Sequence, residues 1–208
     1  MNLYTRQTLM DPSHVEEALA ASVEVGQLVT KVTGLEIATW STIFGLRLGS
    51  ITWSARVDSQ AALAAATAKL IGNADYEKWM NMNRHFFSGL PEDQFLRVVA
   101  FEGTPKPGAY NVVIRAQCAP GKIAAAMAWG VETMQYVAKL TGDSPMMVAS
   151  RYGQFATIGW VTNYDTLDKV DAYHDTVQSD AGYLSRLDEA GDLFVVNSVA
   201  SALSQRLG

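Results

Sequence analysis

The sequence predicts an α+β protein built from two tandem copies of one βαββαβ unit. The first observation is that residues 23–34, VEVGQLVTKVTG, and residues 131–142, VETMQYVAKLTG, agree at seven of twelve positions. The second is that the match continues downstream, where residues 51–53, Ile-Thr-Trp, correspond to residues 158–160, Ile-Gly-Trp. The third is that both halves show the same order of strand-like and helix-like patterns.

The first copy opens on a strand at residues 3–9, followed by Pro12 in the first turn of a helix. Apolar residues spaced three and four apart give that helix one buried face, and Gly34 ends it because glycine adopts the left-handed conformation without strain. Next come two strands, expected at residues 35–44 and 50–57. They are followed by a second helix, which has a cap at 58–59 and an interruption near Gly72, and by a last strand at residues 94–101.

The second copy repeats these signals. Its first helix lies between Pro120 and Gly142, and its second helix starts at the 165–166 cap and is interrupted near Gly182. Strands are expected at residues 111–118, 145–152, 155–164 and 192–199. Between the copies, residues 103–110, GTPKPGAY, have the composition of a linker, which divides the chain into units at 1–102 and 111–208.

Composition restricts the function. A net charge of −5 argues against nucleic acid as a partner, and no apolar run is long enough to span a membrane. The first residues show no secretory signal and Cys118 is the single cysteine, so we expect a cytoplasmic protein. No His, Cys or carboxylate spacing indicates a metal site, and no cofactor is expected.

Two βαββαβ, or ferredoxin-like, units in one chain resemble the dimeric α+β barrel superfamily. This superfamily includes antibiotic-biosynthesis monooxygenases, NIPSNAP-like proteins, polyketide cyclases and two-repeat chlorite dismutases. The resemblance covers nearly the whole chain but rests on topology and the repeat, with no catalytic motif. It implies that the two antiparallel sheets close into an intramolecular barrel, with a ligand inside it or between a sheet and its helices.

Arginines are concentrated in the predicted strands. Strand alternation places Arg56 and Arg115 on the barrel side, and Arg6, aligned with Arg115, should share that face. Arg151 lies in another predicted strand. Because an unpaired buried charge is costly, these groups should bind an anionic or carbonyl-bearing ligand, pair with carboxylates such as Glu36, or lie exposed at the open ends of the barrel.

The aromatic residues and histidines give weaker signals. Trp40 and Trp129 have no matching tryptophan in the other copy and are candidates to shape a pocket. His174, within the second helix of the second copy, is the candidate catalytic base and the residue on which a haem-binding alternative depends. Cys118 is more simply a buried apolar residue.

Three functions therefore remain open. The first is binding of an aromatic or anionic metabolite, with cofactor-independent monooxygenase-like or cyclase-like chemistry. The second is a non-catalytic scaffold, in which the repeated polar stripe Glu24, Gln27 and Lys31 would serve a homodimer. The third is haem binding. A cavity lined by Arg115, Arg56 and a tryptophan would favour a ligand, whereas a filled barrel with paired arginines would favour a scaffold.

Overall fold

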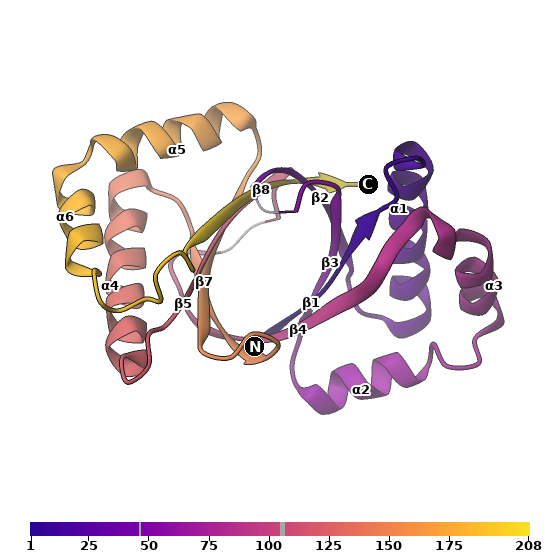
Figure 1. Cartoon of the computed structure of the whole chain (residues 1–208). Coiled ribbons are helices and arrows are strands. Elements are labelled where there is room, and N and C mark those ends of the chain that lie inside the picture. The colour runs from indigo at the N-terminus through magenta and orange to yellow at the C-terminus, as the bar shows by residue number, and fades with distance from the viewer. Residues whose placement is uncertain (46, 105–106) are drawn as a thin grey trace.

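The computed structural model describes residues 1–45, 47–104 and 107–208. Its strands form a closed antiparallel barrel in the order β1-β3-β2-β8-β5-β7-β6-β4, with helices on two opposite sides (Figure 1). The predicted α+β barrel is confirmed. None of the helices in the described part of the chain is long and apolar enough to cross a membrane.

The first half follows the predicted order. After α1, Gly34 has φ 82°, as expected for a glycine that ends a helix, and the Ser59 side chain caps α2 by accepting from the Ala62 N–H. Its elements are β1 (Asn2–Met10), α1 (Val15–Thr33), β2 (Ala38–Gly45), β3 (Ser50–Val57), α2 (Gln60–Ala68), α3 (Ala74–Asn83), the 3₁₀ turn η1 (Arg84–Phe86) and β4 (Phe87–Phe101).

The second half repeats this order with one difference at its end. Gly142 ends the first helix with φ 76°, and Thr166 caps the next helix. Its elements are β5 (Tyr110–Gln117), α4 (Ile123–Thr141), β6 (Met146–Tyr152), β7 (Thr157–Tyr164), α5 (Leu167–Ser179), α6 (Ala181–Glu189) and β8 (Ala200–Leu207).

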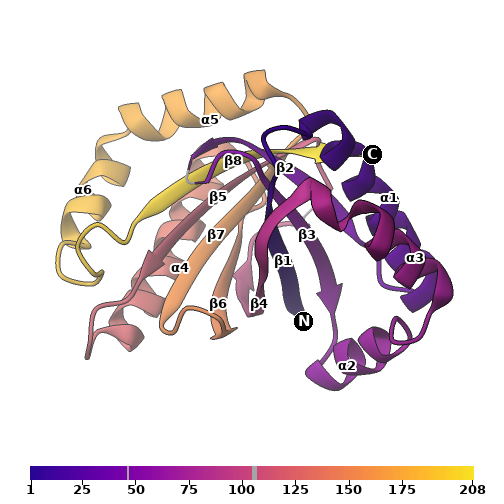
Figure 2. The ribbon, with the colours of Figure 1, turned by 45° about the vertical axis from the view of Figure 1, so that its right-hand side comes forward.

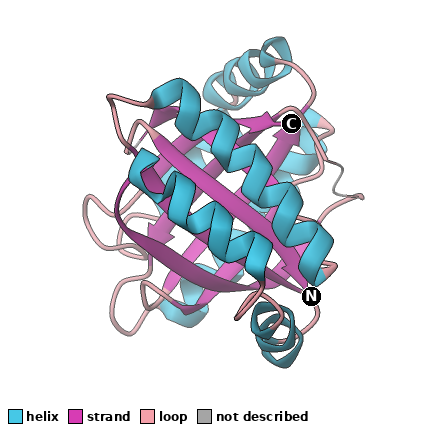
Figure 3. Ribbon diagram, turned by 90° about the vertical axis from the view of Figure 1, so that its right-hand side faces the viewer, coloured by secondary structure: helices cyan, strands magenta, loops and turns pink. Residues whose placement is uncertain are grey.

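Each half forms a four-stranded sheet with the same strand order, β4-β1-β3-β2 in the first and β8-β5-β7-β6 in the second. The barrel closes because the edge strands of the two sheets pair, β2 with β8 and β4 with β6. Helices α1, α2 and α3 cover the outer face of the first sheet, and α4, α5 and α6 cover the second (Figure 2). Viewed from the side, the helices lie over the strands of the barrel wall (Figure 3). Each helix–sheet layer therefore has its own core, separate from the barrel interior.

The strand predicted at residues 192–199 is wrong. Phe194 makes an isolated bridge to Cys118, and the chain then turns, with Ser198 N–H donating to Val195 O and Asn197 at φ 62°. The regular strand β8 begins only at Ala200. Apart from that bridge, the apolar residues of this segment form no regular ladder with a neighbouring strand. Part of the segment lines a cavity described below.

Candidate ligand-binding sites

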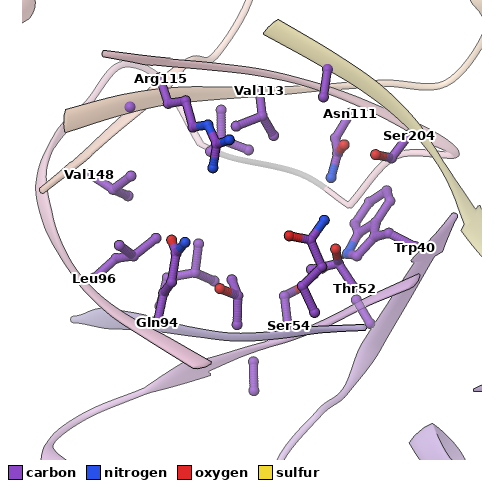
Figure 4. Close-up of a pocket in the computed structure, with 18 of the residues that line it drawn as sticks. Trp40, Thr52, Ser54, Gln94, Leu96, Asn111, Val113, Arg115, Val148 and Ser204 are labelled. Carbon is purple, nitrogen blue, oxygen red and sulfur yellow. Dashed lines mark hydrogen bonds between the residues drawn. The ribbon is translucent and has the colours of Figure 1, made fainter. Parts of the chain in front are cut away.

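The barrel encloses a cavity of about 640 Å³ that is lined from all eight strands. Alternate residues point inward, as β-strand geometry requires (Figure 4). Arg115, Arg56 and Trp40 all line this cavity. The arrangement is the one that the sequence analysis associated with a ligand, and the volume lies in the range of small-molecule sites.

Both halves line the cavity with polar and apolar side chains. The first half supplies hydroxyl and amide groups from Thr5, Gln7, Thr52, Ser54 and Gln94, together with Trp40, whose indole Nε1–H donates to Ser54 Oγ at 3.0 Å. The second half supplies aliphatic surface from Val113, Val148, Val161 and Ala202, together with hydroxyl groups that include Ser150, Thr157 and Ser204. A ligand in the barrel would therefore meet polar and apolar groups from both halves.

Two polar residues of β5 line this cavity. Arg115 extends from β5 into the cavity (Figure 4), and its guanidinium has no hydrogen bond or ion pair with any residue that the structure describes. Asn111, four residues earlier on the same strand, is 8% exposed. Its Oδ1 atom is buried and has no hydrogen-bond partner within the described ranges. Sequence reasoning found Arg115 but missed Asn111.

The remaining strand arginines divide into two groups. Arg56 lines the barrel cavity and is largely exposed, as is Arg206 of β8. Arg47, at the connection of β2 and β3, forms an ion pair with Glu92 of β4. Of the alternatives to ligand binding, exposure describes Arg56, and pairing describes Arg47, although with Glu92 and not with the expected Glu36. Neither alternative accounts for Arg115.

The expected face of Arg6 is wrong. Leu3, Thr5 and Gln7 of β1 line the cavity, so Arg6 points to the opposite, outer side of the sheet. There its Nε and Nη2 atoms donate to Asp93 Oδ1 and Oδ2, each at 2.7 Å. This hydrogen-bonded pair raises the pKa of the Arg6 guanidinium. The alignment with Arg115 was one residue out of register, and a slip of one residue exchanges the two faces of a strand.

The two other predicted site residues lie elsewhere. Arg151 is exposed near the end of β6 and does not line either cavity. His174 on α5 is half-buried against the Tyr173 ring, with 5.1 Å between the ring centroids, and also lies outside both cavities. The catalytic and haem-ligating roles considered for His174 stay predictions that the cavity geometry does not support.

A second cavity, of about 580 Å³, lies in the helix–sheet layer of the second half. Strands β5 and β7 form its floor, helices α4, α5 and α6 form its walls, and part of the segment at residues 190–201 borders it. Trp129, Trp160 and Phe194 form a cluster on its lining, with Trp129 perpendicular to Trp160 at a centroid distance of 6.0 Å. We call this the helix–sheet cavity.

The repeat shows how the packing around this cavity differs from that of the first half. In the first half, Trp79 of α3 is 7% exposed and packs in a cluster with Ala21 and Val25 of α1. The position of Trp79 corresponds to Arg186 at an offset of 107, and the guanidinium of Arg186 lies over the Tyr136 ring at 4.7 Å. On the first helix of each half the change runs the other way: Ala21 of α1 corresponds to Trp129 of α4. The Nε1–H of Trp129 donates to Arg186 O at 3.0 Å. The large aromatic side chain therefore lies on α3 in the first half and on α4 in the second.

Thr133 is the polar group of the helix–sheet cavity that lacks a partner. It is 6% exposed, and its Oγ1 has no hydrogen-bond partner among the residues described. Other hydroxyls on α1 and α4 behave differently: those of Ser22, Thr30, Thr33 and Thr141 each donate to the carbonyl four residues before. The matching residue of the first half is Val25, so the second half carries a hydroxyl where an isosteric apolar side chain would pack.

The other polar groups on this lining include two phenols. Burial raises the pKa of both Tyr173 and Tyr183, so these phenols are neutral hydrogen-bonding groups near pH 7. The described residues that line the cavity include no Asp, Glu, Lys, Arg or His. The site is therefore suited to an uncharged, largely apolar molecule. Sequence reasoning found Trp129 here but missed Thr133, Tyr173 and Tyr183.

Comparisons with known proteins support the fold. No protein-family model and no curated protein sequence matches the chain. Among solved structures, a candidate monooxygenase of Fusobacterium nucleatum superposes with a TM-score of 0.71 and 10% identity, covering 100% of this chain and 92% of that chain. An anthrone oxidase-like protein superposes with a TM-score of 0.71 and 13% identity, covering 100% of this chain and 91% of that chain. A mutant chlorite dismutase of Candidatus Nitrospira defluvii superposes with a TM-score of 0.56 and 14% identity, covering 99% of this chain and 92% of that chain. At these identities the similarity establishes the α+β barrel fold.

Proposed function

We propose that this protein binds a flat, largely apolar aromatic molecule in the helix–sheet cavity. The observation that carries the proposal is the unpartnered Thr133 hydroxyl inside a largely apolar, aromatic-lined space. A buried hydroxyl without a partner costs roughly 1–3 kcal/mol, and a ligand oxygen that accepts its hydrogen bond would remove that cost.

The walls define the shape of the ligand. The tryptophan and phenylalanine cluster offers ring faces and edges, to which a planar aromatic ligand can stack. The neutral phenols of Tyr173 and Tyr183 add further hydrogen-bonding groups at the same lining. A ligand with one or two carbonyl or hydroxyl oxygens on an aromatic skeleton satisfies these features together.

The activity that we propose for this site is oxidation of such a ligand by O₂ without a bound cofactor. Support comes from the fold shared with a candidate monooxygenase and an anthrone oxidase-like protein. Because the described residues of the lining include no charged base, the chain's own role would be to bind, orient and desolvate a substrate that is itself readily deprotonated. For anthrone, the overall reaction consumes one O₂: one oxygen atom becomes the new carbonyl at the ring methylene carbon and the other leaves as water.

Anthrone is therefore the first probe. Binding can be followed by quenching of tryptophan fluorescence, since Trp129 and Trp160 lie on the lining, and turnover by chromatographic measurement of anthraquinone above the rate in buffer. We expect saturable binding that Thr133→Val weakens about threefold to tenfold, the range of one neutral hydrogen bond. Thr133→Met, which also fills space, should weaken it further.

The matched control is Val25→Thr, which makes the same exchange in reverse in the first half. It should leave anthrone binding unchanged. Binding without anthraquinone formation would support a binding protein and contradict the oxidase activity. Equal binding by wild type and both Thr133 variants, or none at all, would contradict the site and favour the scaffold alternative.

A further inference from the structure

We infer that the barrel interior is a second, independent binding site, for a hydroxylated organic acid whose carboxylate is held by Arg115. The site lies on the opposite side of the second sheet from the helix–sheet cavity, because its lining residues alternate with those that face the helices. The inference does not rest on the function proposed above.

Arg115 defines the anionic end of the ligand. Its guanidinium is partly buried in the cavity and meets no carboxylate among the residues that the structure describes. The acidic side chains on the same lining are Glu36 and Glu92, and Glu92 is engaged by Arg47. A planar guanidinium with free donors matches a carboxylate, which can accept two parallel hydrogen bonds.

Asn111 defines a second contact, to a hydrogen-bond donor. Its Oδ1 is buried with no donor within the described part of the chain, and its neighbour across the strand pair, Ser204, is also a buried polar residue of the cavity. Arg115 and Asn111 lie on one face of β5, four residues apart, which separates their Cα atoms by about 13 Å. A molecule that reaches both must carry a donor, such as a hydroxyl, away from its carboxylate.

The rest of the lining favours several hydroxyl groups. Thr5, Gln7, Thr52 and Gln94 of the first half present hydroxyl and amide groups to the cavity, and serine and threonine side chains of the second half also line it. Aliphatic side chains such as Leu96 also line the cavity (Figure 4). An acid that carries both hydroxyls and carbon–hydrogen surface complements this mixed lining. A wholly apolar acid would leave the polar groups without partners.

The probes are glucuronate and gluconate, with glucose as the neutral counterpart that lacks the carboxylate. Affinity can be measured in wild type and variants by isothermal titration calorimetry. NMR on wild type labelled with ¹⁵N at arginine adds a local readout, where the Arg115 Nε–H signal is assigned by its loss in Arg115→Met. We expect at least one acid to shift this signal saturably and glucose to leave it unmoved. Arg115→Met should weaken binding at least about tenfold, as expected for hydrogen bonds to a charged group.

Arg97→Met is the matched control. Arg97 is a strand arginine on β4 that is exposed and does not line the cavity, so its loss should not alter binding of the acids. Arg115→Lys retains the charge without the planar fork and should bind with intermediate affinity. Thermal unfolding of unliganded Arg115→Met should show a midpoint no lower than that of wild type, which separates a binding defect from a folding defect.

Three results would overturn the inference: no saturable shift with either acid, equal affinity for the acids in wild type and Arg115→Met, or equal binding of glucose and glucuronate. The two cavities can be told apart in the same experiments. Thr133→Val should leave binding of the acids unchanged, and Arg115→Met should leave anthrone binding unchanged.

Discussion

The indole Nε1–H of Trp53 on β3 donates a hydrogen bond to the backbone carbonyl of Ser22 on α1, at 2.9 Å. The second half reproduces it, with Trp160 on β7 donating to the carbonyl of Gly130 on α4 at 3.0 Å. Each tryptophan therefore attaches the first helix of its half to the sheet by a hydrogen bond as well as by packing. The repeat has kept an interaction and not only an apolar side chain.

We predict that Trp53→Phe and Trp160→Phe each lower the free energy of unfolding by about 1–3 kcal/mol. Both substitutions remove the indole donor and part of the buried ring, while the phenylalanine keeps an aromatic side chain at the site. Urea unfolding followed by circular dichroism measures the change. Unchanged unfolding midpoints in both variants would show that the hydrogen bonds contribute nothing.

Thr133→Val should stabilise the unliganded protein by about 1 kcal/mol, because it replaces a buried hydroxyl without a partner by an isosteric methyl group. The reverse exchange in the first half, Val25→Thr, should destabilise it by a similar amount. Thermal and urea unfolding of the two variants side by side test this. A loss of stability in Thr133→Val would mean that the hydroxyl has a partner in solution.

The Arg6–Asp93 pair should contribute modestly to stability, because both side chains are well exposed, at 39% and 45%. We expect a coupling free energy of about 0.5–1 kcal/mol from a double-mutant cycle with Arg6→Met and Asp93→Asn. The coupling should fall when the salt concentration is raised. A coupling near zero at low salt would place the pair among ion pairs that do not stabilise the fold.

Tyr4 should make the protein less stable in alkali. Burial raises the pKa of its phenol from 10.0 to about 12. The folded state therefore holds this proton more tightly than the unfolded state, so its contribution is complete below pH 10 and is lost as the pH rises towards about 12. The free energy of unfolding of Tyr4→Phe should fall less steeply than that of wild type across this interval. Tyr152→Phe, at an exposed position, is the control and should follow wild type.

The fold could be predicted from the sequence because the duplication shows the pattern of nearly every element twice. The prediction was wrong for β8, because it placed the last strand on the apolar segment at 192–199 and not at the position that the repeat implies. Shifting the first-half strand at residues 94–101 by the offset of 107 predicts residues 201–208, close to the observed Ala200–Leu207. A strand with polar letters, ASALSQRL, is poorly visible from hydrophobicity alone.

The candidate sites were only partly accessible from the sequence. The alternation of side chains along the strands placed Arg56 and Arg115 on the correct face. Arg6 was placed on the wrong face because its alignment with Arg115 was off by one residue. The packing around the helix–sheet cavity differs from that of the first half by the exchange of Trp79 for Arg186 and of Ala21 for Trp129. These differences are visible only when the two halves are compared position by position. The same comparison shows Val25 opposite Thr133, although no pattern indicates that this hydroxyl lacks a partner.

The position of β8 has a consequence for the order in which the protein is made. It is the last strand along the chain, yet it pairs with β2 of the first half as well as with β5 of the second. Before the second half has been synthesised, the outer edges of β2 and β4 have no strand to pair with. Unpaired strand edges of this kind readily associate with other chains. The barrel wall is closed only when both β8 and β6 have paired with the first half, so the space that holds Arg115 exists only once the two halves have joined.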